Sequence, residues 1–179
     1  MNYDFVLALD PSGAYTEGKG TTGWCVLESA AKKITKGGSL TAISYPAKES
    51  YWEAHVRLID RFYGQYDKRL IVVIEDYLLY ENKAGSQINS RMETCKLIGI
   101  LQHHCFINHI PYTMQLAGEV KNRWTNDILA HKKYITYKQR TLILPATKEP
   151  LNRHSIDAVR HAVHFDTFKN HSRKVGQLV

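Results

Sequence analysis

Two short, uninterrupted apolar runs most constrain how this chain can fold. Residues 5–9 read FVLAL, and residues 70–74 read LIVVI within the predicted strand RLIVVIE at 69–75, so each run has the length of a strand. Runs without polar alternation are typical of a sheet that is covered on both faces. Both runs lead into acids, because Asp10 follows the first and Glu75 follows the second. An unpaired carboxylate is costly to bury, so these two positions require an explanation.

The order of the other elements predicts an α/β fold with a five-stranded mixed sheet flanked by helices. The basic stretch of residues 119–140 is expected to be helical in pieces, with Trp124 in the core. The predicted elements are strands at 5–9, 23–29, 33–44, 69–75 and 112–117, and helices at 49–66, 86–106 and 154–169.

Length and charge limit the class of protein. The 179 residues suit one domain, which we expect over residues 1–168, followed by a basic tail at 169–179. A hydrophobic fraction of 44% can fill a core, and a net charge of +7 favours polyanionic partners. Nucleic acid is therefore the leading predicted partner, and an anionic membrane surface is the second.

The cysteines and the N-terminus indicate the compartment. Cys25, Cys95 and Cys105 are too widely spaced for a zinc motif and too few for a disulfide framework, so reduced thiols are expected. The start of the chain, MNYDFVLALD, lacks the features of a signal peptide, and no later run is long enough to span a bilayer. We expect a cytoplasmic protein without a membrane segment.

Asp10 and Glu75 would lie in one binding site if their strands are parallel neighbours, because ligands bind at the carboxyl ends of such strands. Two nearby anions need a cation between them, and oxygen ligands suit Mg²⁺, with Mn²⁺ as the expected substitute. The final helix adds His154 and Asp157, which are three residues apart and therefore on one face. We predict that these four residues bind one or two divalent cations, which can support phosphodiester hydrolysis.

Each of the four residues also has a purely structural interpretation. Asp10 precedes a proline and, taken alone, is better explained as a turn residue, whereas Glu75 is equally well explained as the buried partner of an arginine. His154 and Asp157 alone are most simply an N-cap and a first-turn acid. Only their joint placement favours a metal site.

At these residues the sequence resembles the RuvC family of Holliday-junction resolvases, within the ribonuclease-H-like superfamily. LALDPSG and TGWCVLES are similar to its first two strands and catalytic aspartate, and VVIEDYLLYENKAGSQINSRMETCKLIGIL is similar to its catalytic glutamate, loop and long helix. NRHSIDAVRHAVHF is similar to the helix that carries its last two metal ligands. The resemblance runs in order through about residue 166 and implies a ribonuclease-H-like fold. Actin-like ATPases share the start of this pattern but need a second glycine-rich phosphate loop, which this chain lacks.

The resemblance implies that Asp10, Glu75, His154 and Asp157 are the catalytic and metal-binding residues. The family often has an aspartate at the position of His154, so this residue is open between a metal ligand and a base for the attacking water. Asp76 is expected to be solvated or to support the site indirectly. His161 lies on the same helix face; contact with metal or phosphate is the smaller expectation, and simple solvation is the larger one.

Two segments are expected to bind DNA. Aromatic and apolar residues after Glu75 suit stacking on unpaired bases, although local packing would also explain them. A basic cluster before the final helix suits phosphate contacts, with a solvated surface as the alternative. The glycine-rich loop at 13–22 is open between phosphate contact, with Lys19, and a plain hairpin. The predicted DNA-binding residues are Tyr77, Leu78, Tyr80, Lys83 and Arg91 in the first segment, and Lys121, Arg123, Lys132 and Lys133 in the second.

These expectations combine into one predicted function, a crossover junction endodeoxyribonuclease that nicks branched DNA symmetrically and leaves 5′-phosphate and 3′-hydroxyl ends. A four-way junction has approximate two-fold symmetry, and the resemblance implies a homodimer. The apolar side of helix 86–106 is the candidate interface, unless it only covers the sheet. The expected location is the cytoplasm of a bacterial or phage-infected cell. The alternatives are another ribonuclease-H-like nuclease, acting on RNA/DNA hybrids or flaps, and a non-catalytic module that binds branched DNA.

Overall fold

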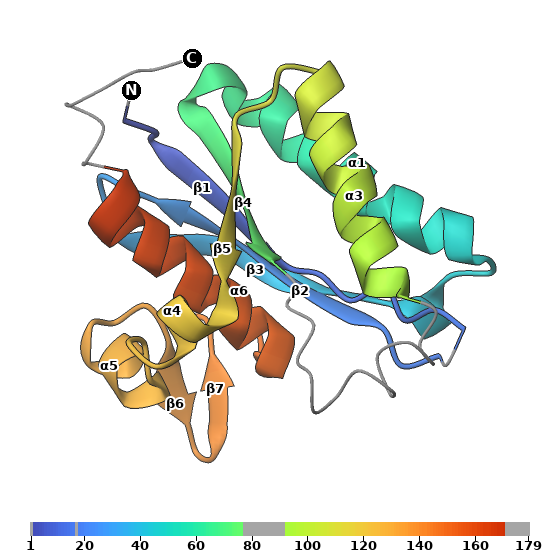
Figure 1. Cartoon of the computed structure of the whole chain (residues 1–179). Coiled ribbons are helices and arrows are strands. Elements are labelled where there is room, and N and C mark those ends of the chain that lie inside the picture. The colour runs from blue at the N-terminus through green and yellow to red at the C-terminus, as the bar shows by residue number, and fades with distance from the viewer. Residues whose placement is uncertain (1, 17, 77–91, 171–179) are drawn as a thin grey trace.

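The computed structural model describes residues 2–16, 18–76 and 92–170, and their elements follow the predicted order (Figure 1). The strands of the main sheet are β1 Phe5–Asp10, β2 Thr21–Glu28, β3 Lys33–Thr41, β4 Leu70–Asp76 and β5 Tyr112–Leu116. The α-helices are α1 Lys48–Tyr66, α3 Glu93–Ile107, α4 Ala117–Lys121, α5 Asn126–His131 and α6 Arg153–His164. Short 3₁₀ turns at Ala42–Ser44 and Asp67–Arg69 flank α1.

The five strands form a mixed sheet in the order β3-β2-β1-β4-β5. β2 is antiparallel to both β1 and β3, whereas β1 and β4 are parallel, as are β4 and β5. The predicted α/β fold and mixed sheet are therefore confirmed. The parallel pairing of β1 with β4 directs the carboxyl ends of the two apolar runs to the same edge.

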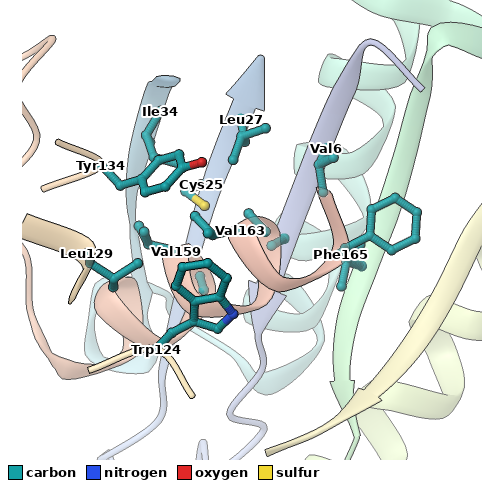
Figure 2. Packing of buried hydrophobic residues seen from close by; sticks show 14 of the residues in the cluster. Val6, Cys25, Leu27, Ile34, Trp124, Leu129, Tyr134, Val159, Val163 and Phe165 are labelled. Carbon is teal, nitrogen blue, oxygen red and sulfur yellow. The ribbon is translucent and has the colours of Figure 1, made fainter. Parts of the chain in front are cut away.

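Both faces of the sheet are buried, which explains the unbroken apolar runs. In β1, Val6 and Ala8 belong to the core beneath α6, while Leu7 and Leu9 belong to the core beneath α1 and α3. Side chains alternate between faces along a strand, so every position from 6 to 9 needs an apolar residue. Figure 2 shows the first of these cores, where Trp124, as predicted, is one of the buried side chains.

The basic segment before α6 contains an element that the sequence analysis missed. It was expected to be helical in pieces, and besides α4 and α5 it forms a hairpin of β6 (Thr136–Lys138) and β7 (Thr141–Ile143). The hairpin turn places Gln139 at a φ of 56° and contains no glycine, so its sequence lacks the usual turn signal. Buried Leu142, Ile143 and Leu144 hold this strand in the core.

The last helix differs from its prediction at the C-terminal end. Regular α6 stops at His164, and Phe165–Lys169 continue as a π-helical turn. Tertiary bonds accompany this turn, because buried Asp166 accepts a hydrogen bond from Lys32 at 2.7 Å. The next residue after the turn, Asn170, exchanges two 2.8 Å hydrogen bonds with the backbone of Tyr3. Helical periodicity alone does not contain this information. The boundary at residue 168 stays a prediction, and the tail beyond Asn170 lies outside the described residues.

The three cysteines are free, with Cys25 and Cys105 buried and Cys95 half-buried. Burial raises the pKa of the Cys105 thiol to about 12, so this side chain behaves as a small apolar group. Among the helices that the structure describes, none combines the length and apolar character needed to cross a membrane.

The N-terminus of α6 approaches the sheet closely at Gly23. This residue pairs with Asp10 across β1 and β2, and a β-carbon at position 23 would overlap the carbonyl of His154. Ser155 fixes the same contact from the helix side, because its hydroxyl donates to the Gly38 carbonyl at 2.9 Å. Glycine at position 23 is therefore a requirement for placing His154 and Asp157 next to Asp10.

We predict that Gly23→Ala lowers the free energy of unfolding by about 1–3 kcal/mol or more, because the added methyl group cannot be accommodated without moving α6. Gly64→Ala, in α1, is the matched control, since a β-carbon there meets nothing within 4 Å. Alanine is the better helix former, so the control should be as stable as the wild type or up to about 1 kcal/mol more stable. Urea denaturation of the three proteins measures both effects, and equal stability of Gly23→Ala and wild type would contradict the close contact.

Candidate metal centre

Three carboxylates converge where β1 and β4 end. The parallel register joins Leu9 to Ile74, so Asp10 and Glu75 follow as neighbours. Asp157 reaches them from the first turns of α6, and one oxygen from each of the three side chains lies within 4.8 Å of the others. They line a cleft of about 380 Å³ together with His154 and Lys121. The sequence prediction that these strand ends and the last helix meet is correct.

Cationic and hydrogen-bonding side chains surround the three acids. Lys121 Nζ lies 3.0 Å from Glu75 Oε1 and 3.0 Å from Asp157 Oδ2, so one ammonium group bridges two carboxylates. His154 Nδ1 lies 2.7 Å from Asp10 Oδ2. Arg160 donates to the other oxygen of Asp157 and, at 2.7 Å, to Asn126. These three donor residues come from α4 and α6.

The environment shifts the pKa values of Asp10 and Glu75 in opposite directions. Burial raises the pKa of Asp10, and the nearby Glu75 charge acts in the same direction, while the hydrogen bond from His154 opposes the shift. Burial also disfavours ionised Glu75, but hydrogen bonds and positive charge from His161 and Lys121 outweigh it and lower the pKa of Glu75 to about 2. The same Asp10 hydrogen bond raises the pKa of His154. An ionised Glu75 repels a negative charge on Asp10, and a cation bound between the two carboxylates would reduce this repulsion.

The donor set fits a divalent cation that prefers oxygen. Mg²⁺ and Mn²⁺ are bound in proteins mainly by carboxylates and water, and three carboxylates with shared space are present here. Lys121 Nζ already occupies a point that two of the acids approach at hydrogen-bond distance, which identifies a position where positive charge is stable. Asp10, Glu75 and Asp157 would therefore hold such an ion.

A buried polar network supports the turn that follows Asp10. The backbone N–H of Ser12 donates to Thr22 Oγ1 at 2.9 Å, and the hydroxyl of Tyr51 donates to the Ser12 carbonyl at 2.7 Å. His55 completes the network, because its Nδ1–H donates to the Tyr51 carbonyl and its Nε2 accepts from Thr22. Burial lowers the pKa of His55 to about 4, so this imidazole is neutral at neutral pH. The network fixes the backbone two residues beyond the Asp10 carboxylate.

The loop at 13–22, for which phosphate contact and a plain hairpin were both open, is attached to the start of α3. The backbone of Gly13 donates to Thr94 Oγ1 at 3.1 Å, and the Thr16 hydroxyl donates to the buried Glu93 carboxylate at 2.6 Å. The indole of Trp52 also donates to the Gly13 carbonyl at 3.3 Å. In its described residues this loop is therefore packed on two helices, and a phosphate contact by Lys19 stays a prediction.

The structure describes only some of the predicted DNA-binding residues, and these differ in their distance from the acidic cluster. Tyr77, Leu78, Tyr80, Lys83 and Arg91 lie outside the described residues, and their roles remain predictions. Lys121 lies within the acidic cluster itself, whereas Lys132 and Lys133 are exposed at the end of α5. Arg123 is exposed and stacks its guanidinium on the Phe168 ring, 4.4 Å from the ring centre.

His161 was expected mainly to be solvated, and this is wrong. Its side chain is fully buried, with Nε2 2.9 Å from Glu75 Oε2 and Nδ1 2.9 Å from Gln115 Oε1. Its distance from Asp157, one turn of α6, was a usable signal, because residues four apart share a helix face. Gln115 and Arg160 were not singled out, and the position of Gln115 beside Glu75 follows from the strand register and not from a local sequence signal.

The comparisons with known proteins support the fold class. No protein-family model and no curated protein matches the sequence. Solved structures do match, and two RuvC structures among them show that the chain has a RuvC-like, ribonuclease-H-like fold. RuvC of Thermus thermophilus in complex with a Holliday junction substrate is 13% identical, with a TM-score of 0.64 over 92% of this chain and 94% of that one. A second Thermus thermophilus RuvC structure is 16% identical, with a TM-score of 0.55 over 89% of this chain and 91% of that one.

The fully buried His55 predicts a dependence of stability on acid. Its pKa is about 4 in the folded state and about 6.5 in the unfolded state, so the unfolded chain binds more protons between these values. The contribution of neutral His55 to the free energy of unfolding is fully present above about pH 6.5 and is lost as the pH falls towards 4. Between about pH 7.5 and 5.5 the loss is about 1.3 kcal/mol. Urea denaturation at both pH values should show a smaller loss for His55→Gln than for the wild type. Equal losses in the two proteins would contradict a neutral, buried His55.

Proposed function

We propose that this protein is a metal-dependent, structure-specific endodeoxyribonuclease that resolves Holliday junctions or other branched DNA by paired symmetric nicks. One observation carries the proposal: Asp10, Glu75 and Asp157 meet within 4.8 Å at the carboxyl edge of a RuvC-like sheet. Each acid has a basic partner of its own, and Glu75 and Asp157 in addition share one cation position at Lys121 Nζ, as two ligands of a metal ion would.

The chain's own residues supply binding, orientation and proton transfer. The three carboxylates would hold Mg²⁺, or Mn²⁺ in its place, and a bound ion supplies charge stabilisation at the phosphate and a more acidic water. His154 is tied to Asp10 through Nδ1 and its side chain is 40% exposed, so Nε2 is positioned to exchange a proton with water or a leaving oxygen in the cleft. The products would carry 5′-phosphate and 3′-hydroxyl ends.

Lys121 would have a second position during DNA binding. Its side chain is 31% exposed on a flexible stem, so it can leave the carboxylates when an ion replaces it. Arg153 lines the same cleft and is exposed. Both side chains could then contact phosphate oxygens on either side of the cut. Lys121 would thus move from stabilising the acids to binding substrate.

The remaining DNA contacts are proposed for the basic face before α6. Lys132, Lys133, Lys138 and Arg140 are exposed at the end of α5 and at the tip of the hairpin. Figure 1 shows this hairpin next to α6, whose first turns carry His154 and Asp157. A duplex arm leaving the cleft would pass along this face, where unpaired basic side chains favour phosphate contacts. The stacking residues after Glu75 remain part of the proposal.

Branched DNA is proposed as the substrate because of the structural neighbour. The Thermus thermophilus RuvC structure with a TM-score of 0.64 contains a Holliday junction substrate. Two cuts in a four-way junction require two sites, and a C2 dimer supplies them with matching geometry.

We predict that the wild type cuts a synthetic four-way junction in Mg²⁺ or Mn²⁺, and that Glu75→Gln still binds the junction but cuts at least about 100-fold more slowly. The loss has a simple cause, because an amide replaces one of three carboxylates that would hold the ion, and about 2.7 kcal/mol of lost stabilisation suffices for this factor. Denaturing gels measure cutting and native gels measure binding.

Glu49→Gln is the matched control for this experiment, because it makes the same chemical change at an exposed position of α1 and should cut like the wild type. RNA/DNA hybrids, flaps and linear duplex complete the substrate panel. Equal cutting by wild type and Glu75→Gln would remove Glu75 from the mechanism. Preferred cutting of hybrids or flaps would favour the other nuclease class, and junction binding without any cutting would favour a non-catalytic binding module.

The proposed dimer would use the outer side of α1 and α3. The buried side of α3, with Leu97, Leu101 and Cys105, covers the sheet, which was the alternative use of its apolar stripe. The outer side nevertheless forms an apolar groove of about 680 Å³ with α1, which Ile100 and Ile107 line. Exposed apolar surface of this kind is typical of an interface.

We predict that the wild type is a dimer and that Ile100→Asp, which places a charge in the groove, shifts it to a monomer and abolishes paired cutting. Ile43→Asp is the control, because Ile43 is 80% exposed and does not line the groove. Size-exclusion chromatography with light scattering gives the mass of each protein at micromolar concentration. A monomeric wild type, or dissociation by both substitutions, would exclude this interface.

A further inference from the structure

His161 joins two neighbouring strands to the acidic cluster. It lies on α6, and its ring contacts Glu75 of β4 on one side and Gln115 of β5 on the other, both at 2.9 Å. Glu75 and Gln115 are direct partners in the parallel register of these strands. The imidazole therefore lies across two adjacent strand ends, with 0% of its side chain exposed.

Hydrogen-bond chemistry determines which group is the donor and which is the acceptor in the contact between His161 and Glu75. An ionised carboxylate only accepts, so the proton of this bond belongs to His161 Nε2. The amide of Gln115 faces Nδ1, and its own Nε2 is buried without a partner. Turning that amide over would present its N–H to Nδ1, and oxygen and nitrogen of an amide have nearly the same shape. In that orientation Gln115 donates to Nδ1 and holds the ring, so that Nε2–H points at Glu75.

This bond decides which oxygen of Glu75 faces the other acids. His161 takes Oε2, which leaves Oε1 on the side where Lys121 Nζ lies at 3.0 Å and also reaches Asp157. Without His161 the carboxylate could rotate, and its oxygens would no longer have distinct directions. A carboxylate that is fixed before an ion arrives binds it with less loss of conformational freedom.

A purely structural role does not explain a histidine at this position. The neighbouring residues Val159, Ala162 and Val163 of α6 are buried in an apolar core. Burying an imidazole in such surroundings is costly unless its hydrogen bonds are needed, and a leucine would fill similar space at lower cost. One of the ring's two hydrogen bonds reaches Glu75 of the carboxylate cluster, and the other anchors the ring to Gln115.

We propose that Gln115 and His161 form a fixed hydrogen-bonded support that orients Glu75 for a divalent cation. His161 is thus a positioning residue that acts through Glu75 and does not itself touch the ion. This inference rests on the proposed function, because it assumes that the acids bind metal. Partners of metal-binding side chains typically account for 10- to 100-fold in metal affinity.

The test is Mn²⁺ binding by the full chain without DNA, measured by the loss of the free-ion signal in electron paramagnetic resonance. His161→Leu removes the donor, and we expect Mn²⁺ affinity to fall by about tenfold or more. His161→Gln keeps an N–H donor on a side chain of similar reach and should stay within about threefold of the wild type. Gln115→Leu leaves His161 in place without its support and should weaken binding in the same direction as His161→Leu. Circular dichroism confirms that each variant is folded.

The outcomes separate this inference from the proposed function. Equal Mn²⁺ affinity in the wild type and His161→Leu would overturn the inference alone, as would equal weakening by His161→Leu and His161→Gln. If His161→Leu does not fold, unchanged affinity in Gln115→Leu overturns it instead, and reduced affinity supports it. A wild type that binds no Mn²⁺ would overturn the proposed metal-dependent nuclease together with this inference.

Discussion

Mutual repulsion among three closely spaced carboxylates is the constraint on which the rest of this structure depends. Asp10, Glu75 and Asp157 bring their oxygens within 4.8 Å of one another in the wall of a cleft, where Asp10 and Asp157 are buried and Glu75 is half-buried. Such a cluster is tolerated only when positive charge and hydrogen-bond donors are equally close. The chain meets this requirement with Lys121 from α4 and with donors on α6, so these two helices are held against the strand ends by charge as well as by apolar packing.

The sheet and the site depend on each other through backbone geometry. Parallel pairing of β1 and β4 brings Asp10 and Glu75 together, and the close approach at Gly23 sets the height of α6 above them. Below the sheet edge, the network of Thr22, Tyr51 and His55 holds the turn after Asp10. The two apolar cores hold the sheet rigid, and the polar networks at the edge of the sheet orient the carboxylates.

Much of this arrangement could be predicted from the sequence, because its main signals are local. The apolar runs defined β1 and β4, and the acids at their ends, with the H-x-x-D pattern of α6, indicated the three carboxylates and His154. The support of Glu75 was not predicted, because the environment of His161 depends on the register that places Gln115 beside Glu75. The β6–β7 hairpin was missed because its turn uses Gln139 in a left-handed conformation instead of glycine. The stacking residues after Glu75 still rest on the sequence alone.

The double hydrogen bond between Asn170 and the backbone of Tyr3 has a practical consequence. It fastens the segment after α6 to the segment before β1, while Asp10 lies at the opposite end of that strand. Fluorophores or surface anchors attached near Tyr3 or Asn170 would therefore begin near the opposite end of β1 from the carboxylates. Single-molecule experiments can immobilise the protein by such a handle and leave the acidic cleft facing the solution.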